Sequence, residues 1–183
     1  MIWIEVEARL VLAGVFAVSA ASKLRSARAF ASFEEAVARL GGVPGRVLRP
    51  VSAGLAGAEA LLAVAVLVPA TAFAAVLLSA VMLLTFSAAL ARALRAGEPV
   101  RCNCFGPSQR PVSAAQLTRN GLLIALAAAA LTTWPSETST PADVGPAPLL
   151  ICLLVAVVTT GAITLWDDLA DLFAVQPAPR RGR

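Results

Sequence analysis

Two cysteines in the chain have the residue type and the spacing needed for redox chemistry. Cys102 and Cys104 are two of only three cysteines, and one residue separates them. A thiolate attacks a disulfide and a neighbouring thiol resolves the mixed disulfide, so such a pair suits two-electron exchange. Arg101 places a positive charge that favours the thiolate, and Gly106-Pro107 turns the chain and leaves the sulfurs accessible. The alternative is a loop with two unrelated small apolar residues.

The close spacing predicts a particular kind of disulfide. A bond between Cys102 and Cys104 closes a tight ring, so we expect it to be strained, reversible and easily reduced. A metal site is a weaker hypothesis, because the chain has no histidine and two thiolates fall short of the four ligands that zinc prefers. We therefore expect no metal and no cofactor. A non-catalytic role, in which the cysteines tether or sense, stays open beside a thiol–disulfide oxidoreductase.

The composition indicates that these cysteines belong to an integral membrane protein. The chain has 183 residues, of which 58% are hydrophobic and 14% charged, whereas soluble domains are about a quarter charged. The apolar residues form long runs, which predicts an all-α bundle of four to five transmembrane helices with the lipid bilayer as its surroundings. The net charge of +4 comes from arginines beside these runs, so we expect no nucleic acid partner.

The apolar runs give the expected spans of a single membrane domain, residues 1–176, followed by a disordered basic tail, residues 177–183. The spans are expected at about 4–23, 51–68, 72–91, 114–134 and 149–166. Pro69–Thr71 is expected to form a tight hairpin between the second and the third. Ser113 and Gln116 form a capping box, which predicts the start of the fourth.

One further helix is expected between the first two spans. From Ser26 to Leu40, apolar residues recur every three or four positions and charged residues take the opposite face. This pattern is typical of an amphipathic helix at the membrane surface, and Gly41-Gly42 predicts its end.

The basic residues predict an orientation. Every Lys and Arg except Arg9 lies between spans one and two, between spans three and four, or in the tail. The positive-inside rule makes that side cytoplasmic. The N-terminus is then outside, and the cysteine segment meets the cytoplasmic face.

A few polar residues fall within or beside the predicted spans. Glu59 lies deep in the second, where a charge costs about 3 kcal/mol or more. We interpret it either as a proton carrier or as a brace that bonds Asn120 or Arg119, and the two roles are compatible. Arg119 either snorkels, holds Glu59 or stabilises a thiolate. Lys23, at the end of the first span, either snorkels or points inward.

The third cysteine is expected to play no part in exchange. Cys152 lies near the outer end of the fifth span, about a membrane thickness of 30 Å from the pair. That separation is far beyond disulfide reach. We expect a thiol packed among apolar side chains.

These features together resemble one family. Cys-Asn-Cys-Phe-Gly at 102–106, Arg119-Asn120, Glu59 and Ser22-Lys23-Leu24 are similar to the methylamine-utilisation protein E (MauE) family, which is related to the DoxX-like small membrane proteins. The resemblance covers about Leu10 to Leu131. It implies a multi-pass protein of the bacterial cell (inner) membrane.

The resemblance also implies a redox function. Members are needed to mature the disulfide-rich β subunit of methylamine dehydrogenase, which implies support of disulfide formation or isomerisation in an exported cysteine-rich partner. Charge counting, however, places the cysteines on the cytoplasmic side. Either residues 103–107 re-enter the protein interior, or the pair takes electrons from a thioredoxin-like cytoplasmic protein. A non-catalytic, DoxX-like assembly subunit of a redox complex remains the alternative.

Overall fold

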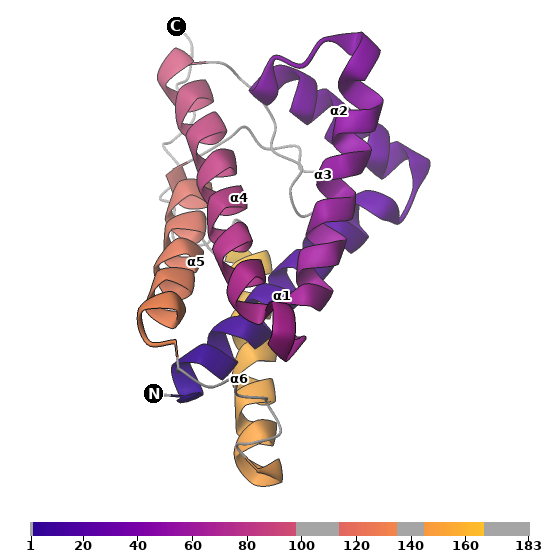
Figure 1. The fold of residues 1–183 in the computed structure, drawn as a ribbon. Coiled ribbons are helices and arrows are strands. Elements are labelled where there is room, and N and C mark those ends of the chain that lie inside the picture. The colour runs from indigo at the N-terminus through magenta and orange to yellow at the C-terminus, as the bar shows by residue number, and fades with distance from the viewer. Residues whose placement is uncertain (1, 98–113, 135–144, 167–183) are drawn as a thin grey trace, which may run out of the picture.

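The computed structural model describes residues 2–97, 114–134 and 145–166, and the regular elements in these ranges are α-helices. This confirms the predicted all-α fold (Figure 1). The helices are α1 (Ile2–Leu24), α2 (Ala27–Gly41), α3 (Gly45–Ala65), α4 (Pro69–Ala96), α5 (Ala114–Thr132) and α6 (Pro146–Thr164).

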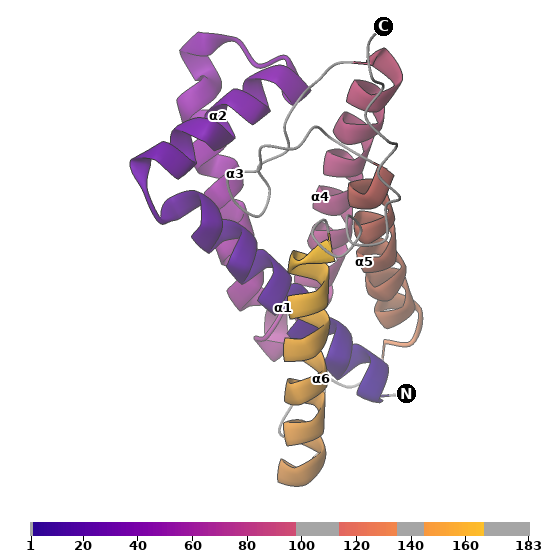
Figure 2. The same cartoon turned by 180° about the vertical axis from the view of Figure 1, so that it is seen from behind.

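The first helix is at the centre of the molecule. α1 contacts every other helix and crosses the bundle obliquely, with α3 on one side and the antiparallel pair α4–α5 on the other (Figure 1). α6 packs along α1, and the view from behind shows it in front of that helix (Figure 2). The main apolar core is built from α1 and from α3 to α6 around it.

The outer surface of the bundle is apolar, as a lipid-facing surface must be. α3, α4, α5 and α6 are long and apolar enough to cross a membrane. Large aliphatic side chains point outward from them: Val158 is 71% exposed and Leu61 is 69% exposed. Soluble monomers rarely expose contiguous apolar patches of such extent. These helices define an integral membrane protein.

α1 is long enough for a span but differs from the other helices in its charges. It has 23 residues, and Glu5, Glu7, Arg9 and Lys23 lie along it. Most of these charges are buried inside the protein rather than exposed on its surface. The predicted first span, residues 4–23, corresponds to α1. For α1 to cross the membrane, the bundle must pair the charges of this helix.

The helix ends depart from the predicted spans by a few residues. α3 starts at Gly45 and continues through Pro50, which hydropathy had placed outside the span.

α4 begins at Pro69, so the turn is at residues 66–68 and not at Pro69–Thr71. Thr71 Oγ1 donates to the carbonyl of Ala65 at 2.8 Å and so satisfies the end of α3. At its far end α4 runs past the apolar stretch until Gly97, whose φ of 68° ends the helix.

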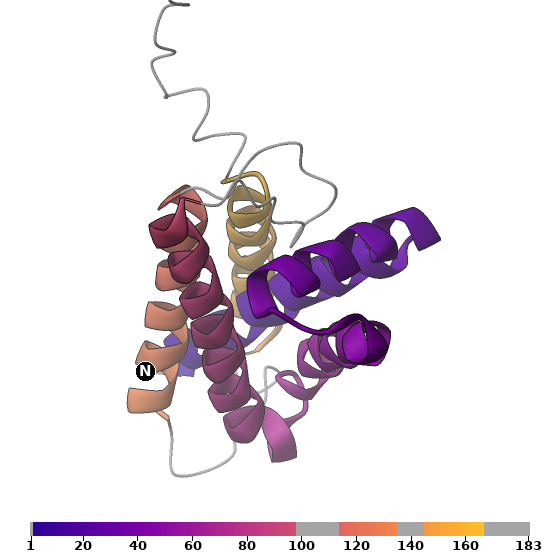
Figure 3. The same ribbon diagram turned by 90° about the horizontal axis from the view of Figure 1, so that it is seen from above.

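α2 confirms the predicted amphipathic helix. The Ser26 hydroxyl caps its start by accepting from the Ala29 amide at 3.1 Å, and Gly42 ends it at φ 63°. Seen from above, α2 lies across the end of the bundle beside α3 (Figure 3). Phe33 and Val37 are buried against Ala56 of α3. Part of the face expected to meet lipid therefore packs on the protein.

We expect the basic end of the bundle to face the cytoplasm. The arginines of α2, of the start of α3 and of the end of α4 gather at one end (Figure 1). Alkaline phosphatase fused after Ser136 should be active, whereas fusions after Arg95 and Arg183 should be inactive, because the positive-inside rule places those points inside. Phosphatase activity from the fusion at Arg183 would overturn this orientation.

We expect Gly14 to set the distance between α1 and α6. A Cβ at Gly14 would lie 2.6 Å from Thr160 Oγ1 and 3.4 Å from Thr160 Cβ. Gly14→Ala should therefore destabilise the protein by about 1–3 kcal/mol, the usual cost of overpacking, when unfolding in mixed micelles is followed by circular dichroism. Thr160→Ala should restore part of the loss. Gly161→Ala is the control, because nothing lies within 4 Å of its added Cβ; an equal effect of both alanines would contradict the close contact.

Candidate functional site

The cysteine pair itself lies outside the described residues. Cys102, Cys104 and Arg101 belong to the connection 98–113, as does the predicted N-cap Ser113. The helices that flank this connection are described: α4 ends at Ala96 and α5 starts at Ala114. The candidate site is therefore built from the buried polar residues of the helices.

The centre of the site is a buried ion pair between α1 and α3. Lys23 Nζ donates to both carboxylate oxygens of Glu59, at 2.8 Å to Oε1 and 2.6 Å to Oε2. Both side chains are almost fully enclosed, with exposures of 1% and 2%. Lys23 thus points inward, and it is the cation that balances Glu59. The sequence had suggested Asn120 or Arg119 as the partner of Glu59, whereas the structure places Lys23 there.

Residues of two helices complete the surroundings of the lysine. Lys23 Nζ also donates to Ser19 Oγ, one turn earlier in α1, at 2.6 Å. The Phe33 ring of α2 lies beneath it, with the ring centroid 4.9 Å from Nζ, a distance at which a cation is attracted to an aromatic face. Three helices, α1, α2 and α3, therefore meet at one ammonium group.

The energetics of this pair are asymmetric. Two charges taken out of water gain little net stability from each other, because desolvation offsets most of their attraction. Removal of one partner, however, leaves the other charge buried and uncompensated, which costs about 3–5 kcal/mol in proteins. The Lys23–Glu59 pair is therefore a strong constraint on which helices lie together, whatever its net contribution to stability.

A second buried cation joins the same two helices near the other end of α1. Arg9 donates from Nη1 to Glu5 Oε1 at 2.9 Å, from Nε to the Val66 carbonyl at 2.8 Å and from Nη2 to the Leu67 carbonyl at 3.1 Å. These carbonyls follow the last turn of α3, where the helix dipole favours a positive charge. No role was predicted for Glu5 or Arg9 from the sequence, and the structure buries both side chains.

The first turns of α5 hold a third group of buried polar side chains. Gln116, Arg119 and Asn120 are each at most 5% exposed. Asn120 Nδ2 donates to Ser87 Oγ of α4 at 3.3 Å. These residues follow the cysteine connection directly in the chain, and their burial shows that Arg119 does not extend to the surface.

The structure thus separates the predicted site residues into groups. Glu59 joins Lys23 between α1 and α3, whereas Asn120 bonds across the α4–α5 contact. Cys152 is a free, buried thiol in α6, as predicted. Within residues 2–97, 114–134 and 145–166, no three His, Cys, Asp or Glu side chains gather so as to hold a metal ion.

Sequence reasoning missed Arg9 and Ser19 as site residues. The signal for Ser19 was its position four residues before Lys23, which puts both on one face of a helix. The signal for Arg9 was its place in the charge distribution. Every other Lys and Arg falls on the predicted cytoplasmic side, and Arg9 falls on the opposite side. Arg9 is buried, and a cation buried in a membrane protein needs an internal partner.

The fold and the site together define a class: an all-α membrane protein whose central helix carries charges that are paired inside the bundle. Comparison with known proteins gives the family. The family model described as "Methylamine utilisation protein MauE" matches residues 1–133. The chain is also 35% identical, over 144 residues, to the methylamine utilization protein MauE of Paracoccus denitrificans, which covers 78% of this chain and 76% of that protein. The chain belongs to the MauE family, as its residues had suggested. No solved structure matches it significantly.

We expect single and paired substitutions at the ion pair to differ sharply. Glu59→Gln and Lys23→Met each leave one buried polar group without its charged partner and should each destabilise by about 3 kcal/mol or more. The double variant Lys23→Met/Glu59→Leu should recover most of this loss, because both charges are gone. Unfolding in mixed micelles, followed by circular dichroism, measures the effect.

The control is the exposed pair Arg39–Glu35, whose side chains are 58% and 64% exposed. Glu35→Gln should change the stability very little, because surface ion pairs contribute little. If Glu59→Gln unfolds no more readily than Glu35→Gln, the buried pair does not hold α1 to α3.

Proposed function

We propose that this chain is a thiol–disulfide redox protein of the bacterial inner membrane. It passes reducing equivalents through Cys102 and Cys104 and so supports the maturation of a partner protein in methylamine utilisation. The observation that carries the proposal is a Cys-x-Cys pair within the segment that the MauE family model matches. The relative's name links the family to methylamine utilisation. The partner is an exported cysteine-rich protein, such as the β subunit of methylamine dehydrogenase, or a thioredoxin-like protein.

The exchange needs no reagent beyond the two proteins. In the oxidising direction a substrate thiolate attacks one sulfur of the Cys102–Cys104 disulfide, a mixed disulfide forms, and a second substrate thiol resolves it. The substrate gains a disulfide, and the cysteine pair receives the two electrons and two protons as two thiols. The reverse sequence transfers electrons the other way. Arg101 stabilises the cysteine thiolate that is released when the Cys102–Cys104 disulfide is attacked.

The buried polar residues support this chemistry as proton and charge partners. Each attack needs a thiol to lose a proton, and Glu59, in its pair with Lys23, is a carboxylate in the same bundle that can accept one. Arg119 and Asn120 are buried in the first turns of α5, which follows the cysteine connection in the chain, and we propose a supporting role for them. In this proposal Glu59 has a structural role through Lys23 and a relay role in exchange. The charge-free pair Lys23→Met/Glu59→Leu separates the two, because it should fold and yet exchange more slowly.

We expect Cys102 and Cys104 to cycle between thiols and a disulfide. Alkylation of the membrane-embedded protein with a mass tag at defined redox potentials should show two thiols that disappear together, because one bond consumes both. Cys102→Ser or Cys104→Ser should abolish this transition and give a trapped mixed disulfide with the partner. Cys152→Ser is the matched control: its thiol is buried in α6, so its loss should leave the transition unchanged.

The alternative is a non-catalytic assembly subunit, and growth distinguishes the two. A strain in which both cysteines are serine should fail to grow on methylamine if the pair must cycle. Normal growth, with the partner's disulfides intact, would sink the redox proposal and leave the scaffold. Thiols that stay reduced over the whole physiological range of potentials would have the same consequence.

A further inference from the structure

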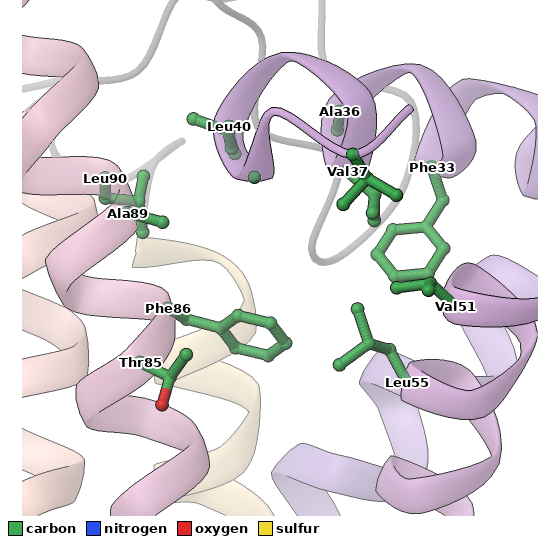
Figure 4. Close-up of a pocket in the computed structure, with 12 residues that line it drawn as sticks. Phe33, Ala36, Val37, Leu40, Val51, Leu55, Thr85, Phe86, Ala89 and Leu90 are labelled. Atoms are coloured by element: carbon green, nitrogen blue, oxygen red, sulfur yellow. The ribbon is translucent and has the colours of Figure 1, made fainter. Parts of the chain in front are cut away.

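A cavity of about 160 Å³ lies between α2, α3 and α4 (Figure 4). Phe33 and Val37 line it from α2, Leu55 from α3, and Phe86 and Ala89 from α4. Among the described residues of this lining, only Thr85 has a polar side chain, and its hydroxyl donates to the Val81 carbonyl of its own helix at 2.8 Å. These described side chains therefore offer dispersion contacts and no free hydrogen-bond donor.

A second hollow, of about 100 Å³, adjoins the first toward the basic end of the bundle. It is lined by Arg39 and Leu40 of α2 and by Arg92, Ala93 and Ala96 of α4. Leu40 lines both hollows, and so the two are neighbours on either side of this side chain. Along α4 the lining changes from apolar at Ala89 to basic at Arg92 within one turn.

We infer that the two hollows form one binding site for an anionic phospholipid of the cytoplasmic leaflet. A phospholipid has the matching order of parts: acyl chains that need an apolar groove and, at the membrane surface, a phosphate that arginine binds well. Basic pockets between transmembrane helices on the cytoplasmic side suit anionic headgroups. An apolar cavity of about 150 Å³ takes up a molecule the size of benzene, so the deeper hollow accommodates a segment of an acyl chain.

The arginines are placed to contact a headgroup. The Arg39 side chain is 58% exposed, and its ion pair with Glu35 uses Nη2. Arg92 is exposed as well and makes a long contact of 3.4 Å from Nη2 to the Leu40 carbonyl. That contact joins the end of α2 to α4, and both arginines line the second hollow. An electrically neutral apolar ligand with hydrogen-bonding carbonyls fits less well, because the apolar lining offers it no donor.

Native mass spectrometry of the purified protein tests the site with two lipids that differ in headgroup, phosphatidylglycerol and phosphatidylcholine, both with the same acyl chains. The wild type should retain phosphatidylglycerol preferentially. Arg39→Gln/Arg92→Gln should reduce that retention by about fivefold per arginine, which corresponds to about 1 kcal/mol for each basic residue near an anionic surface. Arg46→Gln/Arg49→Gln is the control, with the same loss of charge at the start of α3 and outside both hollows.

The acyl-chain part of the site is tested separately. Ala89→Phe fills the deeper hollow and should reduce the retention of phosphatidylglycerol while the exposed arginines stay in place. Equal retention of the two lipids by the wild type would overturn the inference, as would a control double variant that loses as much lipid as Arg39→Gln/Arg92→Gln. A retained isoprenoid quinone in place of phospholipid, or a dimer that Ala89→Phe dissociates, would assign the groove to another occupant. Because Arg39 and Arg92 are exposed, their variants keep the test valid even if Ala89→Phe fails to fold.

Discussion

The structure depends on the rule that a charge inside a membrane protein must be paired. α1 contains Arg9 and Lys23, both buried, and both find their partners mainly on α3 and the turn that follows it. The two cations are separated by about 21 Å along α1, whereas Glu59 and Val66 are only about 10 Å apart along α3. Long basic side chains bridge this difference in spacing. The difference accompanies the oblique path of α1 across the bundle (Figure 1). The position of α1 is thus determined at two points by charge and between them by apolar packing.

Lys23 also explains why an amphipathic helix lies where it does. Phe33 of α2 covers the ammonium group, and the same residue belongs to the cluster that packs on α3. A membrane-surface helix held only by lipid would be free to slide in the interfacial plane. α2 is instead held by one aromatic contact with a buried cation and by apolar contacts with its neighbour. Its capping at Ser26 and Gly42 gives it a defined length between α1 and α3.

The sequence predicted much of the fold because hydropathy and capping residues are local signals. The four helices that are long and apolar enough to cross a membrane, the amphipathic helix and the internal position of Glu59 all followed from such signals. The predicted second span began at residue 51, where the apolar run begins, whereas α3 begins at Gly45 and continues through Pro50. The partner of Glu59 was not predictable in this way. Lys23 is 36 positions away on another helix, and only the packing of α1 on α3 brings the two side chains together.

The charges of α1 have a consequence for how the protein is made. α1 leaves the ribosome before α3, and its ionisable residues make its own transfer into lipid unfavourable, since each charge near a bilayer centre costs about 2.5–3.5 kcal/mol during insertion. Arg9 has Glu5 within α1, but the other compensating groups, Glu59 and the carbonyls of Val66 and Leu67, are synthesised more than thirty residues after Lys23. We therefore expect α1 to settle in the bilayer together with α3, so that the first three helices of the bundle are inserted as one unit.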